Sequence, residues 1–515
     1  MNPDPGLEHR PHEEFAHDTQ EIINDLQFER EVLDESIKHD YTTTGAGIVP
    51  LDRRRPAWHF AAIWLTLEAG FLILFLGFQL YQAGESFGRA ILYLILGSLI
   101  YIAYALAAAY LGSRSGQTHS LLSRSIFGVS GSGLISVLIF LGQMGWAGFV
   151  ANLTAQLFGG LYGWSHILVI GVVLGVVMVF NNLFGFTGVA TYARYVVTPL
   201  LVVWVLYLVI HGIMQGNVVG FVPKATAPLS AVAAISIVTS LAIWGAEPDI
   251  WRYGKPRFWW PALPLAFAFG FGMVLFGMGG WIVARTSSSL AFGPAVATVT
   301  HLSLFGLSWL AFIVIMITQV GINDGNYYEA INALQNLAGG WKHWKRTYSA
   351  LICAAGAGLA AWVIPYEITN GFEKIAAFVA VGVPSATVIM AVDHFLVPRL
   401  FGISRPLTRI PAWADAGVMN WPGVVALLIA VLFGAFATDI IPGETAGTYW
   451  GLAPLETWIL AAVLYIAGVA IVRATASDAR SSLGFSKQIS KADSAGSVPV
   501  DVVEPAPARA SAAVN

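Results

Sequence analysis

The chain has 515 residues, of which 56% are hydrophobic and 11% are charged, and its formal net charge at pH 7 is -3. A soluble globular domain carries roughly 25% charged residues, so this composition excludes an ordinary soluble protein and indicates a membrane protein. No basic stripe runs along the chain, which argues against a nucleic-acid partner. The one cysteine, Cys353, excludes an intramolecular disulfide.

Polar segments flank the apolar part of the chain. Residues 1–55 are polar and acidic, and residues 476–515 are rich in Ala, Ser, Val and Pro without a helical period. Segments of this kind bury too little apolar surface to offset the entropy of ordering. We therefore expect two largely disordered cytoplasmic tails around a transmembrane domain at residues 56–475.

Residues 56–475 contain about twelve apolar stretches, each close to the ~20 residues that cross the hydrocarbon core as a helix. They centre near Leu74, Ile100, Leu141, Val173, Val203, Val238, Phe271, Ile313, Ala355, Val383, Leu428 and Leu464. Basic residues cluster in alternate loops: Arg53, Arg54 and Arg55; Arg114 and Arg124; Arg194; Arg252, Lys255 and Arg257; Lys342, Lys345 and Arg346; and Arg399, Arg405 and Arg409. The positive-inside rule places these loops and both termini in the cytoplasm, with the chain in the cell or inner membrane.

Two of the predicted spans contain residues that break helices. Span one contains residues 68–70 (Glu-Ala-Gly) and then Gly77, and span six runs through residues 245–249 (Gly-Ala-Glu-Pro-Asp). Pro248 has no amide hydrogen, so the carbonyl one turn earlier loses its helical partner. Breaks at corresponding positions of two five-span halves indicate an inverted-repeat transporter with its site at the midplane. The alternative is that these are ordinary membrane-helix glycines and prolines, which are common.

Polar side chains inside the spans predict where a solute binds, because they are costly in hydrocarbon. Gln143 and Trp146 lie one turn apart on span three and share a helix face. In the polar run at residues 323–329, Gly325 predicts a loosened helix in span eight. An aromatic ring beside amides and hydroxyls suits a planar heterocycle, although each residue could also serve only in packing or bond its own helix. The substrate-binding candidates are Gln143, Trp146, Thr239, Ser240, Trp244, Thr318, Gln319, Asn323 and Asn326.

Motifs of common enzymes are missing from the sequence. It has no His-x-x-x-His pair, no Gly-x-Ser-x-Gly elbow, no phosphate loop and no Cys-x-x-Cys pair. We therefore expect no enzymatic activity, no cofactor and no protein-bound metal site. A channel is an alternative, but channels are usually oligomers with fewer spans around a shared pore.

Four short motifs follow one another along the chain. They are residues 111–116 leading into 121–128, residues 142–146 (Gly-Gln-Met-Gly-Trp), residues 249–253 (Asp-Ile-Trp-Arg-Tyr) and residues 322–328 (Ile-Asn-Asp-Gly-Asn-Tyr-Tyr). Their order and spacing resemble the nucleobase:cation symporter-1 family, in the branch of cytosine and purine-cytosine permeases. The last three are similar to its Gln-x-Gly-Trp, Asp-Phe/Tyr-x-Arg/Val-Tyr/Phe and Asn-x-x-Asn-x-Tyr motifs.

The resemblance implies an all-α LeuT-type fold. Two inverted five-helix repeats would cover about residues 56–216 and 228–398, with two further helices at about residues 420–475. It implies that Trp146 stacks on a base, that Gln143 hydrogen-bonds it, and that Phe71 lies at the unwound part of span one. Ser240 stands where relatives have a Phe or Trp that closes the sandwich.

Two departures from the family pattern affect the solute and the coupling ion. Thr318 and Gln319 stand where relatives use an asparagine, which leaves the exact solute open. Sodium-coupled relatives offer two adjacent hydroxyl residues on span eight, whereas this chain has Gly321 and Ile322. Candidates for the ion-coupling carboxylate are Glu68, Asp249 and Glu329.

We therefore expect a secondary transporter that imports a nucleobase or a similar planar heterocycle by cation symport, with a proton favoured over sodium. For the proton, the alternative is that Glu68 pairs with a neighbour and never titrates. Its partners would be the small-molecule substrate and the lipid bilayer. Two alternatives remain: transport of another small ring such as allantoin, a hydantoin or a vitamin, and a transporter-like sensor that binds without transport.

Overall fold

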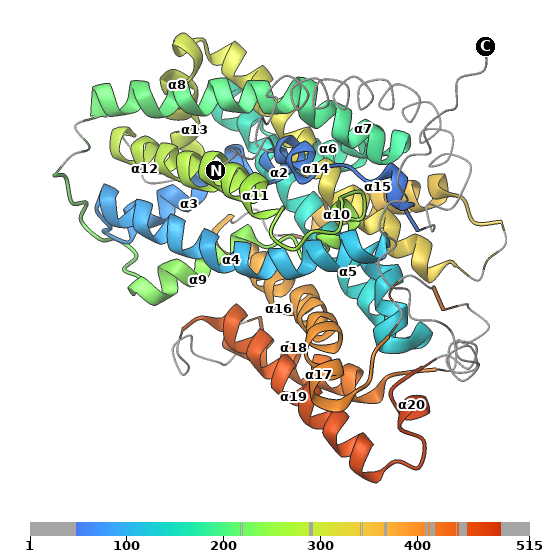
Figure 1. Cartoon of the computed structure of the whole chain (residues 1–515). Helices are drawn as coiled ribbons and strands as arrows, with labels where there is room; N and C mark the ends of the chain where they lie inside the picture. Colours follow the sequence, from blue (N-terminus) through green and yellow to red (C-terminus); the bar gives the residue numbers. More distant parts are fainter. Residues whose placement is uncertain are drawn as a thin grey trace, which may run out of the picture.

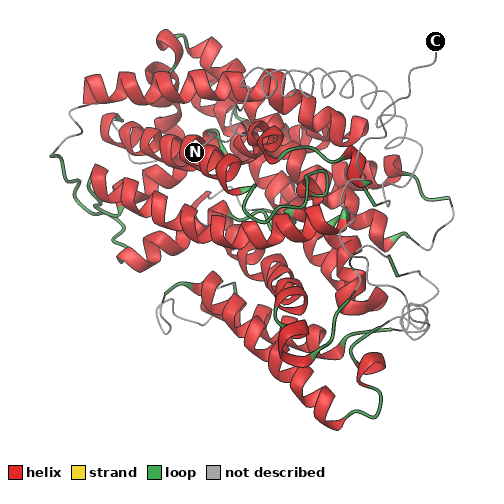
Figure 2. Ribbon diagram, in the orientation of Figure 1, coloured by secondary structure: helices red, strands yellow, loops and turns green. Residues whose placement is uncertain are grey.

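The computed structural model describes residues 48–216, 218, 220–287, 292–339, 341, 343–364, 368–405, 407, 410–411, 418–438, 440–441 and 451–485. Helices dominate these residues, and the only β-type pairing among them is a single bridge between Arg55 and Gly254 (Figures 1 and 2). Most of both predicted tails, residues 1–47 and 486–515, lies outside the described residues.

The first predicted span is a broken helix. Short 3₁₀ turns at Leu51–Arg53 and Ala57–Phe60 lead into α2 (Ala61–Glu68), which is followed by α3 (Phe71–Gln82). The two helices are bent by 60° relative to each other. The chain changes direction at Gly70, whose φ of 129° is a conformation that glycine adopts at low cost. The break expected at residues 68–70 is confirmed.

The sixth predicted span is broken as well. Helix α9 (Ala231–Ala242) ends before an irregular segment, and α10 (Pro248–Trp251) begins at the proline. Gly245 within the irregular segment has a φ of 93°, again a glycine conformation. The break expected at residues 245–249 is therefore confirmed, and it begins at Ile243.

The remaining helices complete the bundle. They are α4 (Phe87–Ser115), α5 (His119–Tyr162), α6 (Ile167–Val177), a 3₁₀ segment Met178–Phe184, α7 (Gly185–Tyr192), a π-helical turn Ala193–Val197, α8 (Thr198–Gly216), α11 (Ala262–Phe269), a π-helical turn Gly270–Leu275, α12 (Phe276–Thr286), α13 (Phe292–Leu302), a 3₁₀ turn Leu304–Gly306, α14 (Ser308–Leu337), α15 (Arg346–Val363), α16 (Ile368–Phe395), α17 (Val397–Phe401), α18 (Trp421–Ala437), α19 (Ala453–Thr475) and α20 (Ala479–Ser482).

Seven helical stretches in the described part of the chain are long and apolar enough to cross a bilayer, and the bent pair α2–α3 is an eighth candidate. One of the seven, Ile167–Gln215, has 49 residues. At 1.5 Å per residue it is roughly 70 Å long, enough for two crossings of a ~30 Å core. With the shorter apolar helices α9 and α18 and the 18-residue α15, these stretches account for the roughly twelve predicted spans.

Helices α3 and α12 approach each other so closely that their backbones touch. A Cβ atom on Gly77 would lie 1.7 Å from the carbonyl oxygen of Gly277, and one on Gly280 would lie 1.7 Å from that of Leu74. Small residues permit such contact between membrane helices. The expectation that Gly77 interrupts span one is therefore wrong: it lies inside α3 and serves packing.

Helix α14 is continuous through its polar run. It extends from Ser308 to Leu337, well past the apolar stretch around Ile313, because its polar second half is buried. A Cβ atom on Gly325 would lie 2.5 Å from Leu67 Cδ2 and 2.7 Å from Trp244 Cζ3. The expectation that Gly325 loosens the helix is wrong, since Gly325 instead leaves a notch that these two side chains fill.

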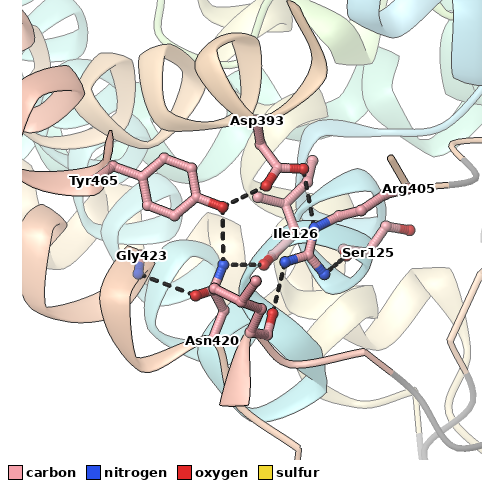
Figure 3. A network of polar contacts seen from close by, with 8 residues as sticks. Ser125, Ile126, Asp393, Arg405, Asn420, Gly423 and Tyr465 are labelled. Carbon is pink, nitrogen blue, oxygen red and sulfur yellow. Dashed lines mark hydrogen bonds and ion pairs between the residues drawn. The ribbon is translucent and has the colours of Figure 1, made fainter. Parts of the chain in front are cut away.

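A buried polar network joins α16, α18 and α19 to the first part of α5 (Figure 3). Arg405 forms an ion pair with Asp393 of α16 at 2.9 Å, and Tyr465 of α19 donates to the same carboxylate. Asn420, which precedes α18, donates to Tyr465 at 3.2 Å and to the carbonyl of Ile126 at 2.8 Å. The network fixes the last two spans against the rest of the bundle.

The folded part of the chain continues past the predicted C-terminal boundary. Helix α20 begins with Asp478 as its capping residue, and Leu483 and Phe485 are buried. Arg405 donates to the carbonyl of Leu483 at 2.6 Å, and its guanidinium lies 4.1 Å from the centre of the Phe485 ring. Residues 476–485, which were assigned to a disordered tail, therefore pack onto the bundle.

Candidate substrate and cation site

A small cavity lies where the two broken spans meet α5 and α14. Its volume is about 30 Å³, and we call it the central cavity. Small-molecule sites usually enclose ~300–1,000 Å³, so a solute can enter this one only if the surrounding helices move apart. The lining residues are Leu67, Glu68, Leu72, Ile73, Trp146, Val150, Leu241, Ile243, Trp244, Ile322 and Asn326.

Two tryptophans line the central cavity from different elements. Trp146 comes from α5, and it packs edge-on against Phe149 with ring centroids 6.1 Å apart and an interplanar angle of 77°. Trp244 comes from the irregular segment after α9, and its ring occupies the notch at Gly325. Both are nearly buried, with 7% and 8% of their surfaces exposed. The cavity therefore offers two aromatic side chains to a flat solute.

The amide side chains form a layer beside the cavity. Asn326 lines it and donates to Asn323 Oδ1 at 2.9 Å, while Asn323 donates to the carbonyl of Ala147 at 3.2 Å. Gln143 is not among the lining residues. Its amide donates to the carbonyl of Trp244 at 3.0 Å and to Glu329 Oε2 at 2.5 Å, and its Oε1 has no partner. Gln143 thus ties α5 to the break in span six.

Five other substrate candidates lie away from the cavity lining. Thr239 donates to the carbonyl of Ile235 at 2.9 Å, and Thr318 donates to that of Ile315 at 2.9 Å, so both hydroxyls bond their own helices. Gln319 reaches Thr154 at 3.5 Å. The candidates outside the lining are Phe71, which is fully buried at the start of α3, Thr239, Ser240, which is half-buried, Thr318 and Gln319.

Three carboxylates are buried around the broken spans. Glu68 ends α2, Glu247 precedes α10 and Glu329 lies on α14, and each is at most 1% exposed. They are near enough for Glu68 and Glu247 to repel each other and for Glu329 to be repelled by both. No ion pair joins any of the three to a basic side chain in the described part of the chain. Their burial without a basic partner leaves a charge that a bound cation or a proton would offset.

Neutral donors hold both oxygens of Glu247, whereas Glu68 and Glu329 are each only partly satisfied. Glu247 accepts hydrogen bonds from Tyr101 at 3.1 Å and Tyr104 at 3.0 Å, both on α4, and from the amide of Gly245 at 3.0 Å. Glu329 Oε2 accepts the bond from Gln143, but Glu329 Oε1 and Glu68 Oε1 both have no partner. Sequence reasoning missed Glu247 as a site candidate, although its place inside the second break was the available signal.

Asp249 has a different environment. Its Oδ1 accepts a bond from the backbone amide of His119 at 2.9 Å, and Arg252 and Arg346 are close enough to act on it electrostatically. Asp249 therefore has positive charge nearby, unlike the three glutamates. Its position at the start of α10 ties span six to the start of α5.

Gly321 and Ile322, the two residues at the positions expected to carry sodium-binding hydroxyls, offer no side-chain oxygen. A Cβ atom on Gly321 would lie 2.8 Å from Thr66 Cγ2 and 2.9 Å from Val197 Cγ2, and Ile322 lines the central cavity. Neither residue supplies a side-chain oxygen, so a sodium ion would find two ligands fewer here than in a site built with hydroxyls.

Comparisons with known proteins place these features in context. No protein-family profile matches the chain. Cytosine permeases from Escherichia coli O157:H7 and from Escherichia coli K12 are each 22% identical to it over 365 residues, which cover 70% of this chain and 81% of theirs.

Solved structures show the same fold. The structure of Mhp1, a nucleobase-cation-symport-1 family transporter in a closed conformation with bromovinylhydantoin bound, aligns with a TM-score of 0.67 at 19% identity, over 88% of this chain and 99% of that one. A Na⁺-coupled sialic acid symporter aligns with a TM-score of 0.57 at 10% identity, over 86% and 97% of the two chains. The protein is thus an all-helical, multi-pass membrane protein with a LeuT-type fold, as expected.

Proposed function

The chain is a distant member of the nucleobase:cation symporter-1 family, and on that premise we propose that it imports a nucleobase or a similar planar heterocycle with a proton. The family assignment makes it a cation-coupled secondary transporter of a small molecule and not an enzyme. The class of solute, the coupling ion and the direction of transport are the substance of the proposal.

The observation that carries the proposal is the lining of the central cavity. Trp146 and Trp244 present aromatic rings, and Asn326 presents an amide, at the point where both broken spans meet. Aromatic side chains stack on many different rings, whereas an amide that both donates and accepts hydrogen bonds distinguishes rings by the polar groups on their edges. Gln143, one layer away, becomes available to a solute if its bond to Glu329 opens.

The carboxylates support cation coupling in general. Glu68, Glu247 and Glu329 are buried together without a basic partner in the described structure, and a bound cation offsets their mutual repulsion. Cation binding therefore favours the compact arrangement around the solute, which is the requirement for coupled transport.

Two features favour a proton over sodium. Gly321 and Ile322 remove two oxygen ligands from span eight, and Glu68 has a carboxylate oxygen without a partner at the end of α2. A proton needs only one such oxygen, whereas sodium needs several. Protonation of Glu68 from outside would remove one of the negative charges of the site and let the loaded carrier reorient. Release of that proton inside would then restore the charge.

The orientation follows from the loops. Clustered basic residues on alternate loops support a cytoplasmic location for those loops and for both termini in the cell membrane. With this orientation, a proton gradient directed into the cell drives import.

Ligand binding tests the solute class. The purified protein is heated with cytosine, purines, hydantoins and allantoin in turn, because a ligand that binds the folded state raises the apparent melting temperature by mass action. We expect stabilisation by at least one base. Hydantoins belong in the panel because Mhp1 has been solved with bromovinylhydantoin bound. Stabilisation by hydantoins alone would overturn the nucleobase assignment.

Uptake of the stabilising compound, labelled and offered to proteoliposomes, separates transport from sensing. A transporter accumulates the compound inside the vesicles, whereas a sensor only binds it. Accumulation equal to that in protein-free vesicles would contradict the proposed import.

A further inference from the structure

A second and larger concavity lies on the outside of the bundle and is lined by α4, α16 and α19; in Figure 1, α16 lies between the other two. Its volume is about 510 Å³, within the ~300–1,000 Å³ range of small-molecule sites. We call it the outer groove. The lining residues are Ile100, Ala103, Tyr104, Ala107, Thr387, Val388, Ala391, Val392, Phe395, Leu396, Leu455, Trp458, Ile459 and Ala462.

The lining of the outer groove is chemically uniform. Among the described lining residues, Tyr104 and Thr387 carry the only hydroxyls, and both are already engaged: Tyr104 donates to Glu247, and Thr387 lies 2.7 Å from His119 Nε2. None of these lining residues is charged. An occupant is therefore recognised by shape and apolar contact alone, which suits a hydrocarbon chain and not a polar solute.

The groove is continuous with the surface that faces the bilayer. Leu396 and Ile459 at its edges are 39% and 48% exposed, and the neighbouring Leu99 and Val463 are 55% and 57% exposed. All four belong to the part of the chain that crosses or borders the membrane, where the surrounding medium is lipid. Lipid acyl chains are thus present at the opening of the groove.

The length of the groove fits part of one lipid. Its lining on α16 extends from Thr387 to Phe395, a rise of about 12 Å at 1.5 Å per residue. That is a little under half of the ~30 Å hydrocarbon core. One acyl chain fits this length, and a head group has no polar partner within it.

The floor of the groove leads to the break in span six. Tyr104 stacks on Trp458 of α19, with ring centroids 4.9 Å apart, and its hydroxyl bonds Glu247 at 3.0 Å. Thr387 donates to the carbonyl of Gly245 at 3.4 Å. The same two side chains thus contact the groove and hold the irregular segment before α10.

From these observations we propose that the outer groove binds one acyl chain of a bilayer phospholipid, and that this chain steadies the broken segment at residues 243–251. A chain packed against Tyr104 and Thr387 limits their motion, and their hydrogen bonds pass this restraint to Gly245 and Glu247. The proposal concerns a lipid site and does not depend on which solute is carried.

Photolabelling tests the binding. The full-length protein is reconstituted with a phospholipid that carries a photoreactive diazirine along its acyl chain, and labelled residues are mapped by mass spectrometry. We expect labels to concentrate on groove residues and to be lost in Ala462→Trp, which fills the groove from α19. Val463→Trp, on the exposed side of the same helix, is the matched control and should keep them.

Ala103→Trp fills the groove from α4 and replaces Ala462→Trp if that variant fails to fold. Labels spread evenly over the exposed residues and unchanged by either variant would mean only non-specific lipid contact. Photo-cross-links between two copies of this protein that disappear when the groove is filled would show that the groove is a protein interface. Either result overturns the proposal.

Hydrogen–deuterium exchange tests the effect on span six. Backbone amides of residues 243–251 should exchange more slowly in long-chain than in short-chain phospholipid, and Ala462→Trp should abolish that difference. Exchange that is independent of chain length, in a protein that still labels in the groove, would refute the proposed link to the break.

Discussion

The notch at Gly325 gives a sharp test of how the central cavity is built. Gly325→Ala places a methyl group 2.5 Å from Leu67 Cδ2 and 2.7 Å from Trp244 Cζ3, both well below van der Waals contact. Overpacking of this kind costs about 1–3 kcal/mol. Replacing a helical glycine with alanine returns about 0.5–1 kcal/mol. We therefore expect a net loss of up to about 2.5 kcal/mol.

The same methyl group displaces the Trp244 ring, so solute affinity should fall together with stability. Gly382→Ala on α16 is the matched control, because a Cβ atom there meets nothing within 4 Å. The two variants are compared by thermal unfolding with and without solute and by the KM of uptake. Equal melting temperatures and equal KM values for Gly325→Ala and Gly382→Ala would refute the packing of Trp244 on Gly325.

Three further substitutions probe the site and the fold. Trp146→Ala removes an aromatic face worth roughly 1–3 kcal/mol per stacked base, so affinity in a binding assay should fall about ten- to a hundredfold while expression stays near normal. Unchanged uptake kinetics would exclude Trp146 from the site. Gln143→Leu should weaken the true solute more than a less polar analogue, since it leaves a polar ring edge unpaired, and equal losses would make Gln143 purely structural. Asp393→Asn leaves Arg405 buried without its counter-charge, which should lower the free energy of unfolding by about 3–5 kcal/mol, and adding Arg405→Met should recover stability. An Asp393→Asn protein as stable as the parent would contradict the importance of the network in Figure 3.

The parts of the fold that sequence could predict are those with a local cause. Gly70 and Pro248 carry their conformational preferences with them, so the two breaks were predictable from residue type and position. The apolar stretches similarly predict membrane helices because hydrocarbon thickness sets their length.

Other features depend on partners far away in the chain. Gly325 looked like a helix breaker, but its role is set by Leu67 and Trp244, which pack against it from other spans. Glu247 gained significance only when α4 placed Tyr101 and Tyr104 on it. Sequence alone ranks such residues by type, whereas their function comes from tertiary contacts.

The candidate site residues also divide into those that the sequence could predict and those that it could not. Trp146, Trp244 and Asn326 line the central cavity, as a stacking and hydrogen-bonding site requires. Thr239 and Thr318 were chosen as polar residues in apolar spans, yet each hydroxyl bonds its own helix. A hydroxyl can satisfy itself locally in this way, so its presence in a span is a weak signal for a ligand.

Gradient-driven uptake into proteoliposomes is the most direct test of proton-coupled import. The labelled solute is offered under an inward proton gradient, under an inward sodium gradient, and under each with a protonophore, for the parent protein and for Glu68→Gln. We predict accumulation that rises as external pH falls, collapses with the protonophore and is unaffected when choline replaces sodium, with Glu68→Gln binding solute but failing to concentrate it. Accumulation that strictly requires sodium at constant pH, and that Glu68→Gln leaves intact, would contradict the account.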